Sequence, residues 1–190
     1  MRIAIARAVS ILGHPVVVML ITALVVASSR GAAILQLRFV GVAVLTLGII
    51  VLGFSWLQVR AGRWAHVDAT SPTERTSLNI FLAGLLFVGA PVFWFLTHQV
   101  VFAGALALSG ALIVTALLVA RWVKVSLHTA FAAYATALLW PLTLAVLVGI
   151  LTTAVVTWSR LALGRHGAAD VIAGLALGTT AGAAFHFWIV

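Results

Sequence analysis

The sequence predicts an all-α protein, a polytopic transmembrane helical bundle of about six to seven spans. Of its 190 residues, 64% are hydrophobic and 7% are charged, whereas a soluble domain averages about a quarter charged residues. Apolar runs long enough to cross the hydrocarbon of a bilayer fill most of the chain. We therefore expect one integral, multi-pass membrane domain over residues 1–190, with two N-terminal spans in residues 1–59 and the functional core in residues 60–190.

The expected spans follow the apolar runs, in the order 11–29, 39–59, 78–96, 100–120, two short helices within 129–158, and 167–189. The stretch 129–158 decides the topology, because it is too long for one span and short for two. Pro141 lies near its middle, and proline is tolerated at the start of a helix but breaks the hydrogen-bond ladder in its interior. We therefore expect a helical hairpin that turns at Pro141.

This hairpin brings the polar segments 60–77, 121–128 and 159–166 to one side of the membrane, whereas a single long helix would place the last of them opposite. Of the three acidic residues, Asp68 and Glu74 belong to the first segment, and Asp170 follows the last one at the start of the next helix. Most of the cations share this face, namely Arg2, Arg7, Arg60, Arg63, Arg75, Arg121, Lys124, Arg160 and Arg165. Such a cluster is suited to binding an anion.

The net charge of +8 could indicate a nucleic-acid partner, but the basic residues are single and lie at the ends of apolar runs. We therefore expect no nucleic acid, and interpret these residues as orientation signals and sites for anionic headgroups. Their excess favours the cytoplasmic face of the cell membrane for the polar segments. The chain has no cysteine, which excludes disulfides and thiolate chemistry.

The segment 159–170 combines the residue types that phosphoryl transfer needs. His166 and Asp170 are four residues apart at the start of the last helix, so their side chains share one face. The carboxylate can hold one ring nitrogen protonated and leave the other free to attack, while Arg160 supplies a fixed cation. The alternative is an ordinary basic loop beside the membrane. Two histidines and a carboxylate could also hold zinc, but the surrounding arginines disfavour a cation, and we expect no metal or other cofactor.

The middle polar segment ends at the start of a helix, where backbone N–H groups can bind phosphate. Ser126 adds a hydroxyl there, Lys124 adds a cation, and His128 could protonate a leaving oxygen. We expect no such role for the other histidines near span ends, which are interpreted as interfacial side chains: His14, His98 and His186. Small residues repeat every fourth position along the last helix, at Gly174, Gly178 and Gly182, and predict close packing within the monomer.

These motifs resemble the signatures of the type 2 phosphatidic acid phosphatase superfamily over roughly residues 60–190. The third signature, Ser-Arg, five residues, His, three residues, Asp, matches without a gap at Ser159, Arg160, His166 and Asp170. Of the second signature, Pro-Ser-Gly-His, Ser126 and His128 match, while Val125 and Leu127 replace the proline and the glycine.

The first signature, Lys, six residues, Arg-Pro, is represented by Arg75 alone, because Asp68 stands in the position of the lysine. Arg63, Arg60 or Lys124 would then supply the missing cation. The resemblance implies a metal-independent phosphatase with an all-helical core. His166 would be the nucleophile, forming a phosphohistidine, and His128 the general acid. Asp170 would orient His166, and the phosphoryl oxygens would be held by Arg75, Ser126 and Arg160, with Lys124 and Arg63 close by.

The implied substrate is a lipid phosphate or diphosphate, with an isoprenoid or a phospholipid headgroup. A non-catalytic carrier of a lipid or an anion on the same scaffold is the alternative from another class. A small transporter is a third reading, but it predicts polar residues near the middle of the spans, where this chain has almost none. The oligomeric state is not predicted.

Overall fold

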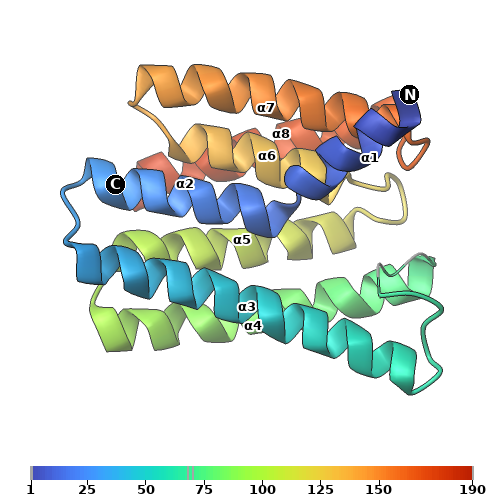
Figure 1. Ribbon diagram of the computed structural model, residues 1–190, viewed down its shortest axis with the longest axis horizontal. Helices are drawn as coiled ribbons and strands as arrows, with labels where there is room; N and C mark the ends of the chain where they lie inside the picture. Colours follow the sequence, from blue (N-terminus) through green and yellow to red (C-terminus); the bar gives the residue numbers. More distant parts are fainter. Residues whose placement is uncertain (1, 68, 70, 190) are drawn as a thin grey trace.

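The computed structural model describes residues 2–67, 69 and 71–189, which form helices and connecting turns without a strand. The helices are α1 (Arg2–Leu12), α2 (Pro15–Ser29), α3 (Ile34–Arg60), α4 (Pro72–Thr97), α5 (Val100–Leu118), α6 (Leu127–Leu138), α7 (Thr143–Ala162) and α8 (Ala168–Trp188). They run back and forth along one axis, with α6 inside the bundle (Figure 1). The all-α prediction is confirmed.

Five helices are long and apolar enough to cross a membrane, namely α3, α4, α5, α7 and α8. The pair α1 and α2 makes a sixth span if it is counted as one, bent by 50°. The expected six to seven spans are thus five to six, because α6 has only 12 residues. It is about 18 Å long, against about 30 Å of hydrocarbon. Its buried position among other helices makes a full-length apolar span unnecessary.

The expected hairpin is confirmed, since α6 ends at Leu138 and α7 begins at Thr143, on either side of Pro141. The loops 61–71, 119–126 and 163–167 consequently lie at one end of the bundle, on the right in Figure 1. We call this the loop end. The turns 30–33, 98–99 and 139–142 lie at the opposite end, together with the C-terminus. The three polar segments therefore share one side, as the sequence predicts.

Two of the predicted polar segments are partly helical. The helix α4 begins at Pro72 rather than at residue 78, because Ser71 and Glu74 form a capping box. The Ser71 hydroxyl accepts the Glu74 N–H at 3.2 Å, and the Glu74 carboxylate accepts the Ser71 N–H at 2.9 Å. That carboxylate also accepts the Ala65 N–H at 3.1 Å. Glu74 therefore ties the loop 61–71 to the start of α4.

The second correction concerns residues 159–162, which belong to the last turn of α7 rather than to a loop. The connection to α8 is only the turn 163–167. Ser159 is fully buried, and its hydroxyl donates to the Val156 carbonyl oxygen at 2.7 Å. Arg160 is thus held by a helix, which restricts where its guanidinium can reach.

The N-terminal region differs most from the prediction, which began the first span at residue 11. Residues 2–12 form the separate helix α1, which packs against α7 with Ala6 fully buried. The bend between α1 and α2 lies at Gly13, where a Cβ atom would collide with the side chain of Val156. Glycine therefore lets the bend approach α7 closely, and this approach carries the following residue, His14, toward the loop end.

The glycines of α8 pack against α6, as the small-residue pattern predicts. A Cβ atom at Gly174 would lie 2.7 Å from the Ser126 carbonyl oxygen, and one at Gly178 would collide with the Ala130 carbonyl oxygen. Close backbone approach of this kind is the usual use of small residues between membrane helices. It aligns the N-termini of α6 and α8, which carry the second and third sequence motifs.

Candidate active site

The segments that carry the second and third motifs are joined directly by hydrogen bonds. The Ser126 N–H donates to the Asp170 carbonyl oxygen at 3.0 Å. The Lys124 ammonium donates to the Arg165 carbonyl oxygen at 2.9 Å. Both bonds connect the loop 119–126 to the turn and first residues of α8. Residues about 40 positions apart in sequence therefore form one rigid site.

His166 and Asp170 are paired as their spacing predicts. The His166 Nδ1 atom lies 3.5 Å from the Asp170 Oδ2 atom, and the two side chains are 10% and 19% exposed. The same carboxylate oxygen accepts the Gly167 N–H at 3.0 Å. Because 3.5 Å is long for a hydrogen bond, this is an electrostatic contact that orients the ring. It turns Nδ1 toward the carboxylate and leaves Nε2 for a substrate.

The surroundings of His166 keep its ring neutral. The pKa of His166 is lowered to about 4, mainly by burial and then by the positive charges of Arg160 and Lys124, while Asp170 acts in the opposite direction. A neutral imidazole is the form that can attack phosphorus. Burial also lowers the pKa of Lys124, as do the charges of Arg75, Arg160 and Arg165. The positive charges of Arg75, Arg160 and Arg165 therefore repel that of Lys124 across this site.

Arg160 lies near enough to His128 and His166 for its charge to act on both rings, and its guanidinium is held by α1. Its Nη1 atom donates to the Ser10 hydroxyl of α1 at 2.7 Å. Its Nε atom is buried and has no hydrogen-bond partner among the described residues. A buried donor without a partner is costly, and here it can donate to an anion. The bond to Ser10 joins the first helix to the site, which the sequence motifs do not indicate.

His128 lies at the start of α6, and its ring contacts that of His14, which the sequence predicted to be only an interfacial side chain. The rings of His14 and His128 are 5.4 Å apart between centroids and nearly perpendicular, at 89°. The His14 Nδ1 atom accepts the Val16 N–H at 3.3 Å, so the proton of neutral His14 sits on Nε2. The sequence feature that could have placed His14 near His128 is the His14-Pro15 pair, because proline here starts a helix on the same side of the membrane as His128.

Ser126 is placed at the site but its polar groups are already paired. It is fully buried, and its hydroxyl shares a hydrogen bond with the Thr129 hydroxyl at 3.1 Å. Its N–H binds the Asp170 carbonyl oxygen. In this conformation Ser126 joins α6 to α8 and does not present its hydroxyl to the pocket. The expectation that it holds a phosphoryl oxygen stays a prediction.

The residues predicted to represent the first motif, or to supply its missing cation, lie less close to the histidines. Arg75 lies in the first turn of α4, and its charge acts on Lys124. Arg63 is exposed and donates to the Gln58 side chain at 3.3 Å. Asp68 lies outside the described residues. The structure therefore brings Arg75 to the cation cluster, while Arg63 bonds to the end of α3.

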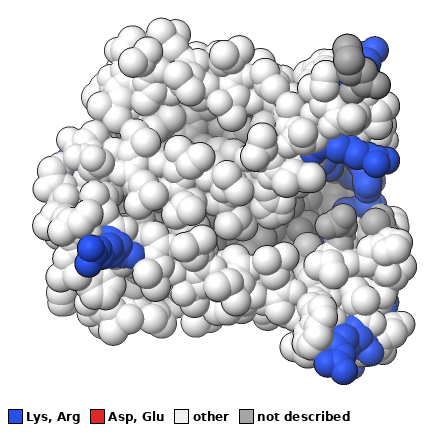
Figure 2. Space-filling view, viewed as in Figure 1, with Lys and Arg blue, Asp and Glu red and all other residues white. Residues whose placement is uncertain are grey.

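Positive charge gathers at the loop end. Figure 2 shows several Lys and Arg side chains there, on the right, and one patch at the opposite end. Among the residues that the structure describes, no three His, Cys, Asp or Glu side chains are arranged to hold a metal ion. The groups available for chemistry are thus imidazoles, one carboxylate and cations.

Comparisons of the chain with protein-family models, with curated proteins and with solved structures gave no significant match. The functional argument consequently depends on the site residues and their arrangement.

Proposed function

We propose that this protein is a membrane phosphatase that hydrolyses a lipid phosphate or diphosphate through a phosphohistidine intermediate. One observation carries the proposal: a buried, neutral His166 touches Asp170 on one side and has the charges of Arg160 and Lys124 nearby. An imidazole that is oriented by a carboxylate and surrounded by cations is suited to attack an anionic phosphorus centre. The residues match the third signature of type 2 phosphatidic acid phosphatases, with which the chain has the resemblance described above.

In the first step, the His166 Nε2 lone pair would attack phosphorus, and the bond from phosphorus to the leaving oxygen would break. Burial, and then the charge of Arg160, lower the pKa of His128 to about 3 in the free site, so this ring would take up a proton together with the anionic substrate. It would then give that proton to the leaving oxygen, so that the product leaves as an alcohol or as a phosphate monoester. Arg160 and Lys124 would stabilise the charge on the equatorial oxygens, and the unpaired Nε–H of Arg160 is a suitable donor. Asp170 would stabilise the positive charge that develops on His166.

In the second step, water would attack the phosphohistidine, with neutral His128 accepting its proton. Inorganic phosphate would leave and His166 would return to its neutral form. Each proton given in the first step is thus recovered in the second. The scheme uses no metal and no cofactor.

A lipid substrate fits the position of the site. His128 belongs to α6, inside the bundle, and Arg160 to the last turn of α7, and the site lies where these two helices reach the loop end. A phosphate headgroup at the membrane interface would reach it while its isoprenoid or acyl chains stay in the bilayer. The cell membrane, with the site on the cytoplasmic face, is the proposed location, from the basic excess at this end.

A lipid or anion carrier is the second candidate function. The paired hydroxyl of Ser126 favours it, because a phosphatase of this type is expected to direct that group to phosphate. A carrier would bind lipid phosphates at the same cations without releasing inorganic phosphate. Transport alone needs no oriented nucleophile, so the His166–Asp170 pair favours the enzyme.

The test is release of inorganic phosphate from a panel of lipid phosphates and diphosphates, in neutral detergent with a chelator. We expect release by the wild type and none by His166→Ala. His98→Asn, at the opposite end, is the matched histidine control and should keep full activity; asparagine tolerates the left-handed conformation of this residue. Absence of release by folded wild type, with retained binding of the lipids, would favour the carrier. Release that the chelator abolishes would contradict the metal-independent mechanism.

A further inference from the structure

A large apolar cavity lies between α2, α3, α4, α5, α6 and α8, and its lining includes His98 and Pro15, the neighbour of His14. Its volume is about 590 Å³, within the range of about 300–1,000 Å³ that is usual for small-molecule sites. It extends along α2 from Pro15 to Arg30, a length of roughly 22 Å at 1.5 Å per residue. At the end opposite the loop end it is lined by the turns that contain Arg30, His98 and Gln99, and we call this part its mouth.

The walls of the cavity suit a hydrocarbon chain. Val44, Leu47, Leu86 and Phe131 line its length, and Arg30 is the only charged residue among its lining residues. The hydroxyl of Ser109 is satisfied, because it donates to the Ala105 carbonyl oxygen at 2.8 Å. A narrow apolar space of this kind offers many dispersion contacts to a flexible chain and little to a polar molecule.

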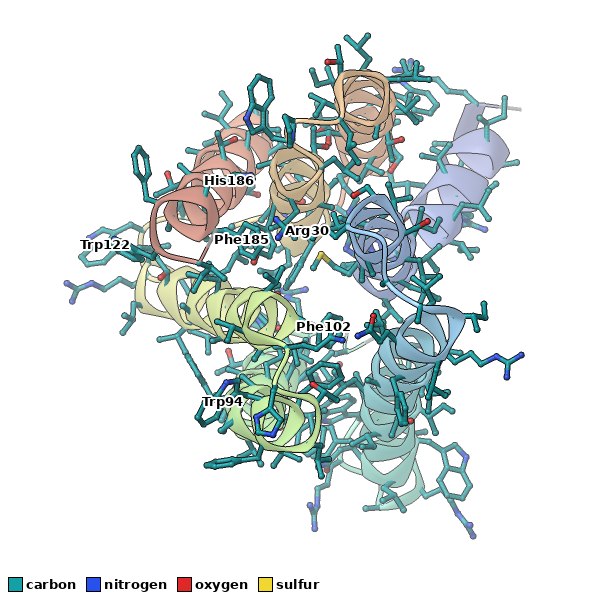
Figure 3. All side chains as sticks on the ribbon, turned by 90° about the vertical axis from the view of Figure 1, so that its left-hand side faces the viewer. Arg30, Trp94, Phe102, Trp122, Phe185 and His186 are labelled. Carbon is teal, nitrogen blue, oxygen red and sulfur yellow. The ribbon has the colours of Figure 1, made fainter. Side chains whose placement is uncertain are left out.

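The mouth of the cavity carries an uncompensated positive charge. Among the described residues, the Arg30 guanidinium makes no hydrogen bond, ion pair or ring contact. Neither Glu74 nor Asp170, the acidic residues that the structure describes, belongs to a turn at this end. Figure 3 looks onto this end and shows Arg30, Phe102 and Phe185 around the middle of the bundle. An arginine in such a position favours a carboxylate or phosphate, which it can bind through two parallel hydrogen bonds.

We propose that this cavity binds an anionic, single-chain amphiphile from the bilayer, with its headgroup on Arg30 and its chain between α2, α3 and α5. Charge complementarity at the mouth and the apolar walls together select this ligand class. The site is separate from the proposed phosphatase site, since its headgroup lies at the opposite end of the bundle. It therefore stands whether or not the histidines are catalytic.

The first experiment tests the headgroup. Purified protein in an uncharged detergent is titrated with radiolabelled palmitate and, separately, with its methyl ester. We expect saturable binding of palmitate and weaker binding of the ester. Arg30→Gln should weaken palmitate binding about tenfold, the value of a lost charged hydrogen bond, and should not change ester binding. Arg38→Gln is the matched control, because Arg38 is exposed at the same end and does not line the cavity.

The second experiment tests the chain. Val44 lines the cavity and is 9% exposed, whereas Val42 on the same helix is 61% exposed and does not line it. We expect Val44→Phe to remove palmitate binding by filling the space and Val42→Phe to leave it unchanged. Ala23→Phe, on the α2 wall, gives a second way to fill the cavity if Val44→Phe does not fold. Thermal unfolding of each variant in detergent verifies folding.

The outcomes separate this proposal from its alternatives. Equal palmitate binding by wild type and Arg30→Gln, with binding lost in Val44→Phe, would overturn the headgroup assignment; the cavity would then hold the tail of a molecule whose headgroup lies elsewhere. Unchanged binding in both filled variants would overturn the cavity itself as the site. His166→Ala should bind palmitate like wild type, so failure of the phosphatase proposal leaves this result unaffected, and loss of binding in this variant would contradict a separate site.

Discussion

The two ends of the bundle differ in how their charged side chains are held. At the loop end, three loops and α1 meet. Its cations are held by hydrogen bonds, from Lys124 to the Arg165 carbonyl oxygen and from Arg160 to the Ser10 hydroxyl. At the opposite end the connections are short turns, and Arg30 is the one charged residue among those described that line the apolar cavity. Densely linked polar groups hold reacting atoms in place, whereas a lone charge over a cavity is suited to binding.

The largest effect is expected from separating the two helices that align the loop end. Gly178→Leu should lower the free energy of unfolding by about 3 kcal/mol or more, because its side chain would collide with the Ala130 carbonyl oxygen. Gly84→Leu is the matched control, since nothing lies within 4 Å of the Cβ position at Gly84. Thermal unfolding in detergent measures both. Equal stability of the two variants would show that α6 and α8 do not need this close approach.

The next effect concerns the buried cation of the loop end. Arg160→Gln should lower kcat/KM for a lipid phosphate by roughly 100- to 1,000-fold, the cost of removing a donor that stabilises transition-state charge. Ser10→Ala removes only the group that holds Arg160, so a loss of less than about tenfold is expected, the value of one hydrogen bond to a charged group. Steady-state phosphate release measures both variants. A loss in Ser10→Ala as large as in Arg160→Gln would refute this division of roles.

The pH dependence of kcat/KM tests how the cations of the loop end act on His166. Because the pKa of His166 is lowered to about 4, kcat/KM should show an acid limb near pH 4, where protonation of the ring removes the nucleophile. Lys124→Gln removes one of the charges that lower this pKa, so the acid limb should move to higher pH. A profile of kcat/KM from pH 3.5 to 8 tests this, and an unmoved limb would mean that His166 does not set it.

The same shift affects stability. Unfolding returns His166 to its ordinary pKa near 6.5, so the unfolded chain binds a proton at a higher pH than the folded chain. The contribution of this residue is therefore fully present above about pH 6.5 and is lost as the pH falls toward 4. His166→Asn should flatten the dependence of the unfolding temperature on pH within this window.

The smallest effect is expected at His14. His14→Asn retains a side-chain acceptor for the Val16 N–H at the start of α2 but removes the ring beside His128. We expect kcat to fall by up to about tenfold with KM unchanged, because His14 would act only through His128. Loss of proton transfer by His128 itself would lower kcat by much more than tenfold. His14→Ala also loses the helix cap and should unfold at a lower temperature. An unchanged kcat in His14→Asn would limit His14 to capping α2.

Much of the molecule follows from local sequence. Apolar runs specify the helices, Pro141 specifies the hairpin, and the hairpin puts the polar loops at one end. The contact between His166 and Asp170 follows from helical periodicity, since residues four apart share a face. These features depend only on near neighbours along the chain, so they can be predicted from the spacing of residue types in the sequence.

Tertiary packing decided the rest. Ser10 and His14 join the site across long sequence separations, 150 positions for the bond between Ser10 and Arg160, because Gly13 lets the bend after α1 approach α7. The same packing pairs the Ser126 hydroxyl with Thr129, where the motif predicted a phosphate ligand. The cavity beside Arg30 likewise arises from how the six helices that line it are spaced. No local pattern specifies such distances, which depend on side-chain volumes meeting between helices far apart in sequence.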